Sequence, residues 1–264
     1  MIALHCLPGV FRAKFARLVA YRAEMAIWIF TALLPLVMLA LWNSVTVEQS
    51  IGKFGQEEVA RYFVATLIVR QLTGAWVIWQ LNFDIRSGAL SSQLLRPVNP
   101  LVVYAIWMLA AMPLRLLFLS PLVMVLAAWR PELLLMPSVD GLALFLISVG
   151  LAWGIAFLAQ AIFGILAFWL DRTEGLFGVW LAIWLVFSGY IAPLSFFPEA
   201  AQDVLRWLPF RSMLAVPVEI LGGFLPYDAA VGDVGIQLMW LLILLFLTSL
   251  LWKKGLQRYG AFGA

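Results

Sequence analysis

Long runs of apolar residues dominate the chain, and polar residues fall mainly in the stretches between them. A helix of roughly 20 apolar residues spans the hydrocarbon core of a bilayer. The strands of a membrane barrel would instead alternate in polarity over short segments, so continuous runs favour helices. We therefore predict an all-α, polytopic membrane protein with six transmembrane helices, at about residues 25–47, 60–83, 101–129, 140–170, 175–195 and 234–253.

The composition supports a membrane protein and excludes several other classes. Of the 264 residues, 64% are hydrophobic and 12% are charged, whereas a soluble domain carries about 25% charged residues. The excess of apolar side chains has to face lipid. The length predicts one transmembrane domain over residues 1–264 without a second globular domain. With one cysteine and one histidine, Cys6 and His5, the chain offers no intrachain disulfide, no metal cluster and no histidine-based catalysis in the membrane.

The distribution of basic residues orients the helices, because cytoplasmic loops of membrane proteins are enriched in Lys and Arg. With the N-terminus placed in the cytoplasm, ten of the 17 Lys and Arg fall on the cytoplasmic side and five on the opposite side. The remaining two, Arg70 and Arg115, lie within spans. We therefore predict that both termini are cytoplasmic.

The N-terminal residues 8–23 combine apolar and basic side chains at helical spacing, with Phe11 and Phe15 one turn apart. This pattern is typical of an amphipathic helix lying in the inner headgroup layer. The alternative is that these residues are simply the positively charged flank of the first span.

The outer segment, residues 191–233, stays apolar although it contains five prolines. Backbone at membrane depth has to be hydrogen-bonded internally. We therefore predict short re-entrant or interfacial helices here, at Glu199–Leu208 and Val216–Leu221.

The cytoplasmic loop at residues 83–99, between the second and third spans, contains a short amphipathic pattern. Ser87 is a suitable N-cap, Ala89–Leu95 provides about two helical turns, and Pro97 ends them. Leu90, Leu94 and Leu95 would share one face. Such a helix could dock into a groove on a partner, or it could be an interfacial helix that only covers the ends of the spans.

Two sets of short motifs resemble a known family. The loop contains Ile85-Arg86-Ser87-Gly88 and Leu94-Leu95-Arg96-Pro97. The outer segment contains Phe196-Phe197-Pro198, Leu208-Pro209-Phe210 and Pro217-Val218-Glu219-Ile220-Leu221-Gly222-Gly223. Their order relative to the spans resembles the permease subunits of type-two ATP-binding-cassette exporters, and within that class a subfamily of unassigned function. The resemblance covers essentially the whole chain.

The resemblance implies a division of labour between subunits. The loop would be the coupling loop that docks on a separate ATPase subunit, through Asp84, Arg86, Gly88, Leu90, Leu94, Leu95, Arg96 and Pro97. The outer gate would involve Phe197, Pro198, Pro209, Phe210, Pro217, Glu219, Gly222 and Gly223. This chain has no phosphate-binding loop, because its only Gly-Lys pair, Gly52-Lys53, is followed by Phe54. ATP and Mg would bind the partner, and a second permease subunit, the same or related, would complete the transporter in a bacterial cytoplasmic membrane.

Arg70 and Arg115 are candidates for the translocation pathway, because a charge within a span is costly unless it is paired or hydrated. They could attract an anionic group of the substrate. Alternatively, they are structural and bind backbone carbonyls or an acid at a subunit interface.

The functional prediction is a non-enzymatic exporter subunit that moves a hydrophobic or amphiphilic substrate. The alternatives are an integral membrane enzyme acting on lipid, or a scaffold subunit of a membrane complex. No motif for lipid chemistry is present, and neither a cofactor in this chain nor a nucleic-acid partner is expected.

Overall fold

The structure of the chain, a computed structural model, describes residues 7–20, 34–46, 50–51, 54–134, 138–170 and 173–261. Within these ranges the regular structure is helical, and no strand extends beyond the isolated bridge between Ile51 and Phe54. The predicted all-α class is therefore confirmed.

Four helical stretches are long and apolar enough to cross a membrane. They correspond to the second, third, fourth and sixth predicted spans and contain 30 to 33 residues each. At about 1.5 Å per residue, each exceeds the thickness of about 30 Å of a hydrocarbon core. The four stretches are Gln56–Arg86, Pro100–Trp129, Val139–Phe168 and Tyr227–Tyr259.

Three of these stretches are divided into consecutive helices, whereas the last is continuous. The divided stretches are α4 (Gln56–Thr73) with α5 (Val77–Arg86), α7 (Pro100–Ala110) with α8 (Met112–Trp129), and α9 (Val139–Ile165) with the 3-10 turn η3 (Leu166–Phe168). The continuous helix, α14 (Tyr227–Ala261), begins at Tyr227 rather than near residue 234. The end of the predicted outer segment therefore belongs to the last helix.

The first and fifth predicted spans correspond to shorter apolar helices. These are α3 (Leu34–Thr46) and α10 (Glu174–Phe187), of 13 and 14 residues. Residues 25–33 of the first predicted span lie outside the described residues. The number of six spans therefore stays a prediction.

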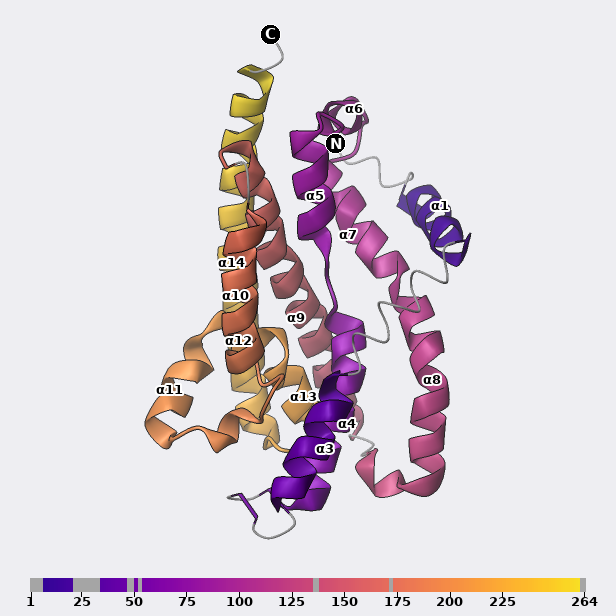
Figure 1. The fold of residues 1–264 in the computed structure, drawn as a ribbon, viewed down its shortest axis with the longest axis vertical. Helices are drawn as coiled ribbons and strands as arrows, with labels where there is room; N and C mark the ends of the chain where they lie inside the picture. The colour runs from indigo at the N-terminus through magenta and orange to yellow at the C-terminus, as the bar shows by residue number, and fades with distance from the viewer. Residues whose placement is uncertain are drawn as a thin grey trace.

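Short helices lie toward both ends of the bundle (Figure 1). The helix α6 (Leu90–Leu94) lies at the same end as the C-terminal part of α14, whereas α11 and α13 lie toward the other end. The segment before α14 contains the 3-10 turn η4 (Leu194–Phe196), α11 (Glu199–Trp207), α12 (Pro209–Met213) and α13 (Ala215–Leu221). Another 3-10 turn, η2 (Pro131–Leu133), follows α8.

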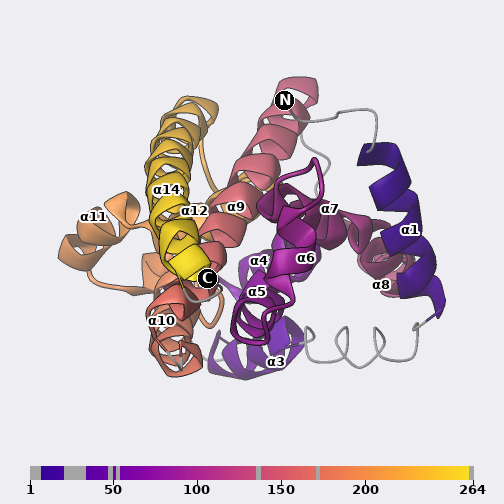
Figure 2. The ribbon, with the colours of Figure 1, turned by 90° about the horizontal axis from the view of Figure 1, so that it is seen from above.

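The N-terminal helix α1 (Leu7–Ala20) lies beside α7 and α8, on the side of the bundle opposite α11 (Figure 2). Its Phe15 packs against Ala111 and Leu114, at the junction between α7 and α8. The last residues of the predicted amphipathic helix, 21–23, lie outside the described residues.

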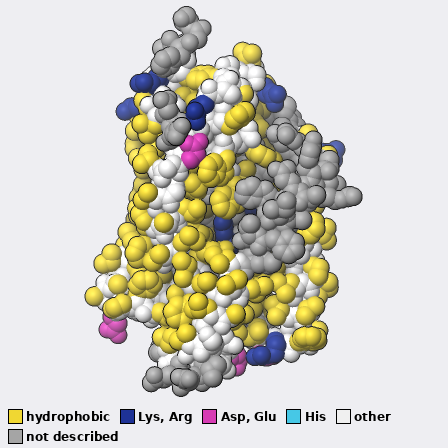
Figure 3. All heavy atoms as spheres, in the orientation of Figure 1, with side chains coloured by type: hydrophobic (Ala, Val, Ile, Leu, Met, Phe, Trp, Pro, Cys, Tyr) yellow, Lys and Arg dark blue, Asp and Glu magenta, His cyan; other side chains and the backbone are white. Residues whose placement is uncertain are grey.

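The stretch formed by α4 and α5 is the centre of the bundle. In its most apolar window 72% of the residues are buried, against 22% in the stretches formed by α7–α8 and by α14. The outer helices instead present large apolar side chains such as Leu117 and Phe246 to the surroundings. One face of the molecule is accordingly covered mainly with apolar side chains (Figure 3). Such a surface is suited to contact with lipid rather than with water.

Candidate functional site

The predicted coupling loop starts differently from the sequence-based expectation. Ser87 is the C-cap residue of α5, and its backbone N–H donates to the Phe83 carbonyl at 2.9 Å. Gly88 then adopts a φ of +79°, a left-handed conformation that favours glycine and commonly ends a helix. The next helix, α6, begins at Leu90 with Ala89 as its N-cap residue. The prediction of Ser87 as the N-cap was therefore wrong.

The three leucines of the loop do not share one exposed face. Leu90 is completely buried in the main hydrophobic core, whereas 89% of Leu95 and 36% of Leu94 are exposed. Leu90 therefore anchors α6 to the bundle and is unavailable to a partner. The exposed apolar side chains of the loop include Phe83, Leu94 and Leu95, and Arg86, Arg96 and Pro97 are exposed as well.

Asp84 fixes this loop to the bundle. The side chain is buried, and its carboxylate accepts hydrogen bonds from Gln80 Nε2 at 2.8 Å, Gln93 Nε2 at 2.7 Å and Tyr104 OH at 2.5 Å. These donors belong to α5, α6 and α7, so one carboxylate holds all three helices. Hydrogen bonds to a charged acceptor are stronger than those between neutral groups. Asp84 is thus a positioning residue rather than part of the exposed surface.

A further contact connects the loop to the last helix. The hydroxyls of Ser91 and Tyr259 share a hydrogen bond of 2.9 Å. Tyr259 also packs its ring edge-on against Phe168, which follows α9. The C-terminal part of α14 therefore supports the loop from the side opposite α7.

The second predicted span is broken near its middle, which the sequence analysis did not anticipate. Helix α4 ends at Thr73, and Gly74 to Trp76 are not helical. The Gly74 carbonyl accepts a hydrogen bond from Arg115 Nη1 at 2.7 Å, and the Ala75 carbonyl accepts one from Gln160 Nε2 at 2.5 Å. Irregular backbone within a membrane requires such internal partners. The geometry of Arg115 thus matches the structural alternative, in which it binds a backbone carbonyl.

Arg70 lies directly before this break and is surrounded by aromatic rings. Its guanidinium carbon is 5.1 Å from the ring centre of Trp184, 5.5 Å from that of Trp76 and 5.8 Å from that of Tyr190. These distances are within the range of cation–π attraction. In the described part of the chain, neither Arg70 nor Arg115 forms an ion pair. A role of either arginine in a translocation pathway stays a prediction.

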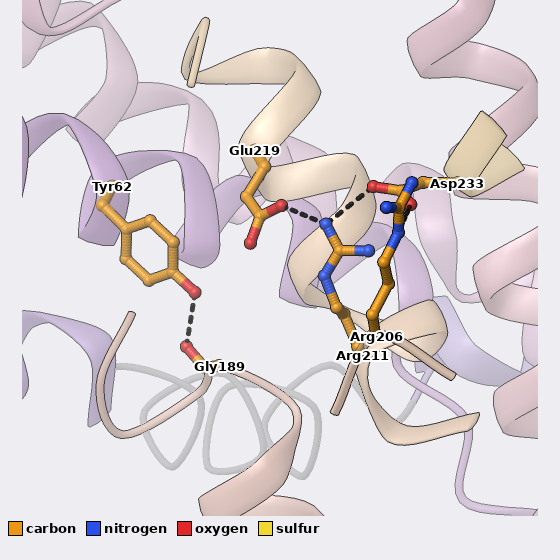
Figure 4. A network of polar contacts seen from close by, with 6 residues as sticks. All are labelled: Tyr62, Gly189, Arg206, Arg211, Glu219 and Asp233. Carbon is orange, nitrogen blue, oxygen red and sulfur yellow. Dashed lines mark hydrogen bonds and ion pairs between the residues drawn. The ribbon is translucent and has the colours of Figure 1, made fainter. Parts of the chain in front are cut away.

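A network of ion pairs holds the outer segment to the last helix (Figure 4). Arg211 Nη2 donates to Glu219 Oε2 at 2.6 Å and to Asp233 Oδ2 at 2.7 Å, which joins α12, α13 and α14. Arg206 of α11 donates to the other oxygen of Asp233 at 3.0 Å. Burial raises the pKa of Glu219 above its ordinary value, although the positive charge of Arg211 acts in the opposite direction.

A neighbouring contact ties the central helix to the segment after α10. Tyr62 OH donates to the Gly189 carbonyl at 2.8 Å, and Gly189 has a φ of +86° (Figure 4). A Cβ at residue 189 would lie 2.4 Å from the Tyr62 hydroxyl, so glycine is required there by both conformation and space.

The residues predicted for the outer gate are spread over this segment and differ in exposure. Pro217 and Gly222 are buried, Pro198 and Gly223 are exposed, and Phe197, Pro209, Phe210 and Glu219 lie between these extremes. Only Glu219 takes part in the ion-pair network. The predicted helices at Glu199–Leu208 and Val216–Leu221 correspond to α11 and α13, whereas α12 was not predicted. Their depth in a membrane and a gating role stay predictions.

The sequence analysis missed several polar residues that the structure brings together. Gln160 is a single amide in an apolar run, and Gly74 interrupts another run four residues after Arg70. A polar or flexible residue within a span is a recognisable signal, because its hydrogen bonds have to be satisfied locally. No sequence signal pairs Arg211 of α12 with Asp233 of α14, between which α13 intervenes.

The long apolar helices and their helical connections define a polytopic membrane protein. The chain belongs to the ABC-2 family of transporter proteins, whose pattern it matches over residues 25–263. This membership confirms the resemblance to type-two permeases, and it indicates a transport subunit rather than an enzyme. It also implies, in general terms, an ATPase partner. No curated protein matches the chain.

Proposed function

We propose that this chain is the membrane-spanning subunit of an exporter that moves a hydrophobic or amphiphilic substrate. A separate ATPase chain binds ATP and Mg and supplies the energy. The family membership supports transport as the general role. The observation that supports coupling to an ATPase is the exposed pair Leu94 and Leu95, held in place by Asp84 at one end of the bundle.

The proposed topology has six spans with both termini in the cytoplasm of a bacterial inner membrane. In it, α3 and α10 belong to the first and fifth spans. The positive-inside count places the coupling loop on the cytoplasmic side. The arrangement in Figure 1 agrees with this topology, since α6 and the end of α14 lie together. The basic residues Lys253, Lys254 and Arg258 of α14 then belong to the same side.

The coupling surface is small but chemically suited to a protein groove. Leu95 and Leu94 supply an apolar knob, and Arg86 and Arg96 supply charges at its edge. Apolar contacts at the centre of an interface contribute affinity, whereas charges at the rim contribute mainly to specificity and association rate. Rigid attachment of α6 through Asp84 would allow movement of the ATPase to be passed to the spans.

The full transporter contains two permease subunits in this proposal. The helices α7, α8 and α14 expose apolar side chains, so a second permease and lipid would share their outer faces. The short helices between α10 and α14 would close the pathway on the outside, with Arg211 holding them to α14.

The test is co-purification of the tagged chain from its native host in mild detergent. We expect mass spectrometry to identify an ATPase chain with a phosphate-binding loop. Leu95→Asp should remove the ATPase from the complex, because a carboxylate would be buried in the apolar groove without a partner. The matched control is Val139→Asp, which changes a residue of similar exposure, 86%, at the opposite end of the bundle. Retention of the ATPase by Leu95→Asp would refute the coupling role.

A further inference from the structure

A small cavity lies beside the break in the second predicted span. Its polar lining comes from Arg70 and Thr73 of α4 and Gln160 of α9. Its apolar lining includes Trp76 next to the break and Trp180 and Trp184 of α10. The volume of about 20 Å³ is room for one group of the size of a water molecule. The cavity thus combines a cation, an amide and several indole rings.

The charge at this cavity is not balanced by any described acid. A guanidinium has five N–H donors and is always charged. The rings around Arg70 attract its charge, and Tyr190 also forms a side-chain hydrogen bond with it, but neither replaces an anionic acceptor. Arg115 adds a second positive charge nearby. Both guanidinium groups approach Gly74: a Cβ at this residue would lie 2.8 Å from Arg115 Nη1 and 3.6 Å from Arg70 Nη1. Two like charges in an apolar bundle favour an anion between or beside them.

Gln160 provides an independent indication of a ligand. Only 7% of this residue is exposed, and its Nε2 donates to the Ala75 carbonyl. Its Oε1 is buried and has no hydrogen-bond partner among the described residues. A buried acceptor without a partner is unfavourable, and in native proteins such a group commonly awaits a ligand or water. The cavity therefore offers an acceptor for a hydroxyl next to a donor for an oxyanion.

The tryptophans indicate that the ligand is also apolar. Trp180 stacks on Phe177 with ring centres 5.4 Å apart, and Trp184 is buried beside Arg70. Both tryptophans belong to α10, whose other side exposes Val179 and Ile183. The cavity has space for a terminal oxygen of the ligand, and an attached hydrocarbon chain would continue along this apolar helix.

We propose that this cavity binds the oxyanion of an acidic amphiphile, either a phosphate or a carboxylate attached to a hydrocarbon chain. Arg70 binds the oxyanion, Gln160 accepts a hydrogen bond from its protonated oxygen or from a neighbouring hydroxyl, and Arg115 holds the backbone at Gly74. This assignment rests on the proposed transport function and specifies the class of substrate.

The test measures ligand binding to the purified full chain in a neutral detergent, without ATP or an ATPase. Dodecyl phosphate, dodecanol and inorganic phosphate are titrated separately, followed by calorimetry and by tryptophan fluorescence. We expect saturable binding of dodecyl phosphate at least tenfold tighter than that of either other probe. The comparison with dodecanol measures the contribution of the oxyanion, and the comparison with inorganic phosphate measures that of the chain.

Variants identify the residues responsible. Arg70→Gln should weaken binding of dodecyl phosphate at least tenfold, since a hydrogen-bonded charge pair is lost. Gln160→Leu should weaken it about fivefold, the effect of one neutral hydrogen bond. Arg70→Lys keeps the charge and should bind with intermediate affinity, so the proposal remains testable if Arg70→Gln fails to fold. The matched control is Arg130→Gln, an exposed arginine at the end of α8, which should bind as the wild type does.

The proposal is overturned if Arg70→Gln and Arg70→Lys both bind dodecyl phosphate as tightly as the wild type. It is also overturned if dodecanol or inorganic phosphate binds as tightly as dodecyl phosphate. Because the assay contains no ATPase, its result is separate from the co-purification test with Leu95→Asp. Failure of one therefore does not imply failure of the other.

Discussion

Replacing Asp84 by asparagine should detach the coupling loop from the bundle while preserving the size of the side chain. The carboxylate uses Oδ1 for Gln80 and Oδ2 for both Gln93 and Tyr104. Asparagine has one acceptor oxygen and one NH₂ group, so in either orientation at least one donor faces the NH₂ group. The remaining hydrogen bonds also lose their ionic character.

The size of the effect follows from the burial of Asp84, which is 4% exposed. A hydrogen bond to a charged group contributes about 1.5–3 kcal/mol. Losing one such bond and weakening the others should therefore destabilise the protein by about 2–4 kcal/mol. Rotation of the Gln80 amide would relieve part of this cost, which favours the lower end of the range. Tyr104→Phe removes one of the bonds and should cost about 1.5–3 kcal/mol.

Unfolding of the purified protein in detergent measures these changes, and the rate of ATP hydrolysis coupled to transport measures their functional consequence. Asp84→Asn and Tyr104→Phe should be clearly non-additive in the double variant, because they remove the same bond. Ser91→Ala is the control, since it removes an exposed hydrogen bond of the same loop and should cost at most about 0.5 kcal/mol. If Asp84→Asn is no less stable than Ser91→Ala, Asp84 does not anchor the loop.

Four other substitutions test the packing and the polar contacts. Gly255→Ala should lower the free energy of unfolding by about 1–3 kcal/mol, because its Cβ would lie 2.1 Å from the Phe168 ring. Gly235→Ala on the same helix has free space and should leave the stability unchanged. Equal unfolding temperatures of the two variants would contradict this prediction. Arg211→Met should cost about 3–5 kcal/mol by leaving buried carboxylates without their partner. Glu219→Gln should cost only about 1 kcal/mol, because the amide oxygen can still accept from Arg211 and Arg211 keeps its ion pair with Asp233. A larger loss of stability for Glu219→Gln than for Arg211→Met would refute the central role of Arg211 in this network. Gly74→Ala should displace Arg115 from the Gly74 carbonyl and lower the free energy of unfolding by about 1–2 kcal/mol. In a double-mutant cycle, this loss of stability should largely disappear when Arg115 is replaced by Gln.

The helical class and four of the spans could be predicted because they depend on composition and on runs of apolar residues. The runs fix which segments are helical in a membrane, and the lengths of α9 and of the α7–α8 stretch agree closely with the predicted ranges. The bounds were less accurate where the polarity changes gradually. At α14, for example, Tyr227 and Asp228 read as loop residues but continue the last helix.

The site could be predicted only where its residues are close in the sequence. The loop was predicted from the short amphipathic pattern at Ala89–Leu95 and from the motif Ile85-Arg86-Ser87-Gly88, which are both local signals. The burial of Leu90 could not be predicted, because the short pattern does not show which side of α6 faces the bundle. The contacts of Arg70 also depend on distant segments, since Trp184 and Tyr190 belong to another part of the chain. Such contacts depend on how the helices pack in space, which cannot be read from the local sequence pattern.

Helix α5 joins the two proposed sites. Its ten residues, Val77–Arg86, begin directly after Trp76 at the cavity and end at the coupling loop, over about 15 Å at the ordinary helical rise. Close packing of Leu81 against Gly164 keeps α5 in contact with α9, and Asp84 fixes its end to α6.

The break at Gly74 separates α5 from α4, so the helical hydrogen bonds do not continue from one helix to the other. Because a short helix moves as a rigid unit, a displacement of the loop would carry Trp76 with it and change the wall of the cavity beside Arg70. The hydrogen bonds from Arg115 and Gln160 to the broken segment resist that displacement. Loss of the Arg115 bond in Gly74→Ala is therefore expected to lower transport-coupled ATP hydrolysis as well as the stability of the protein.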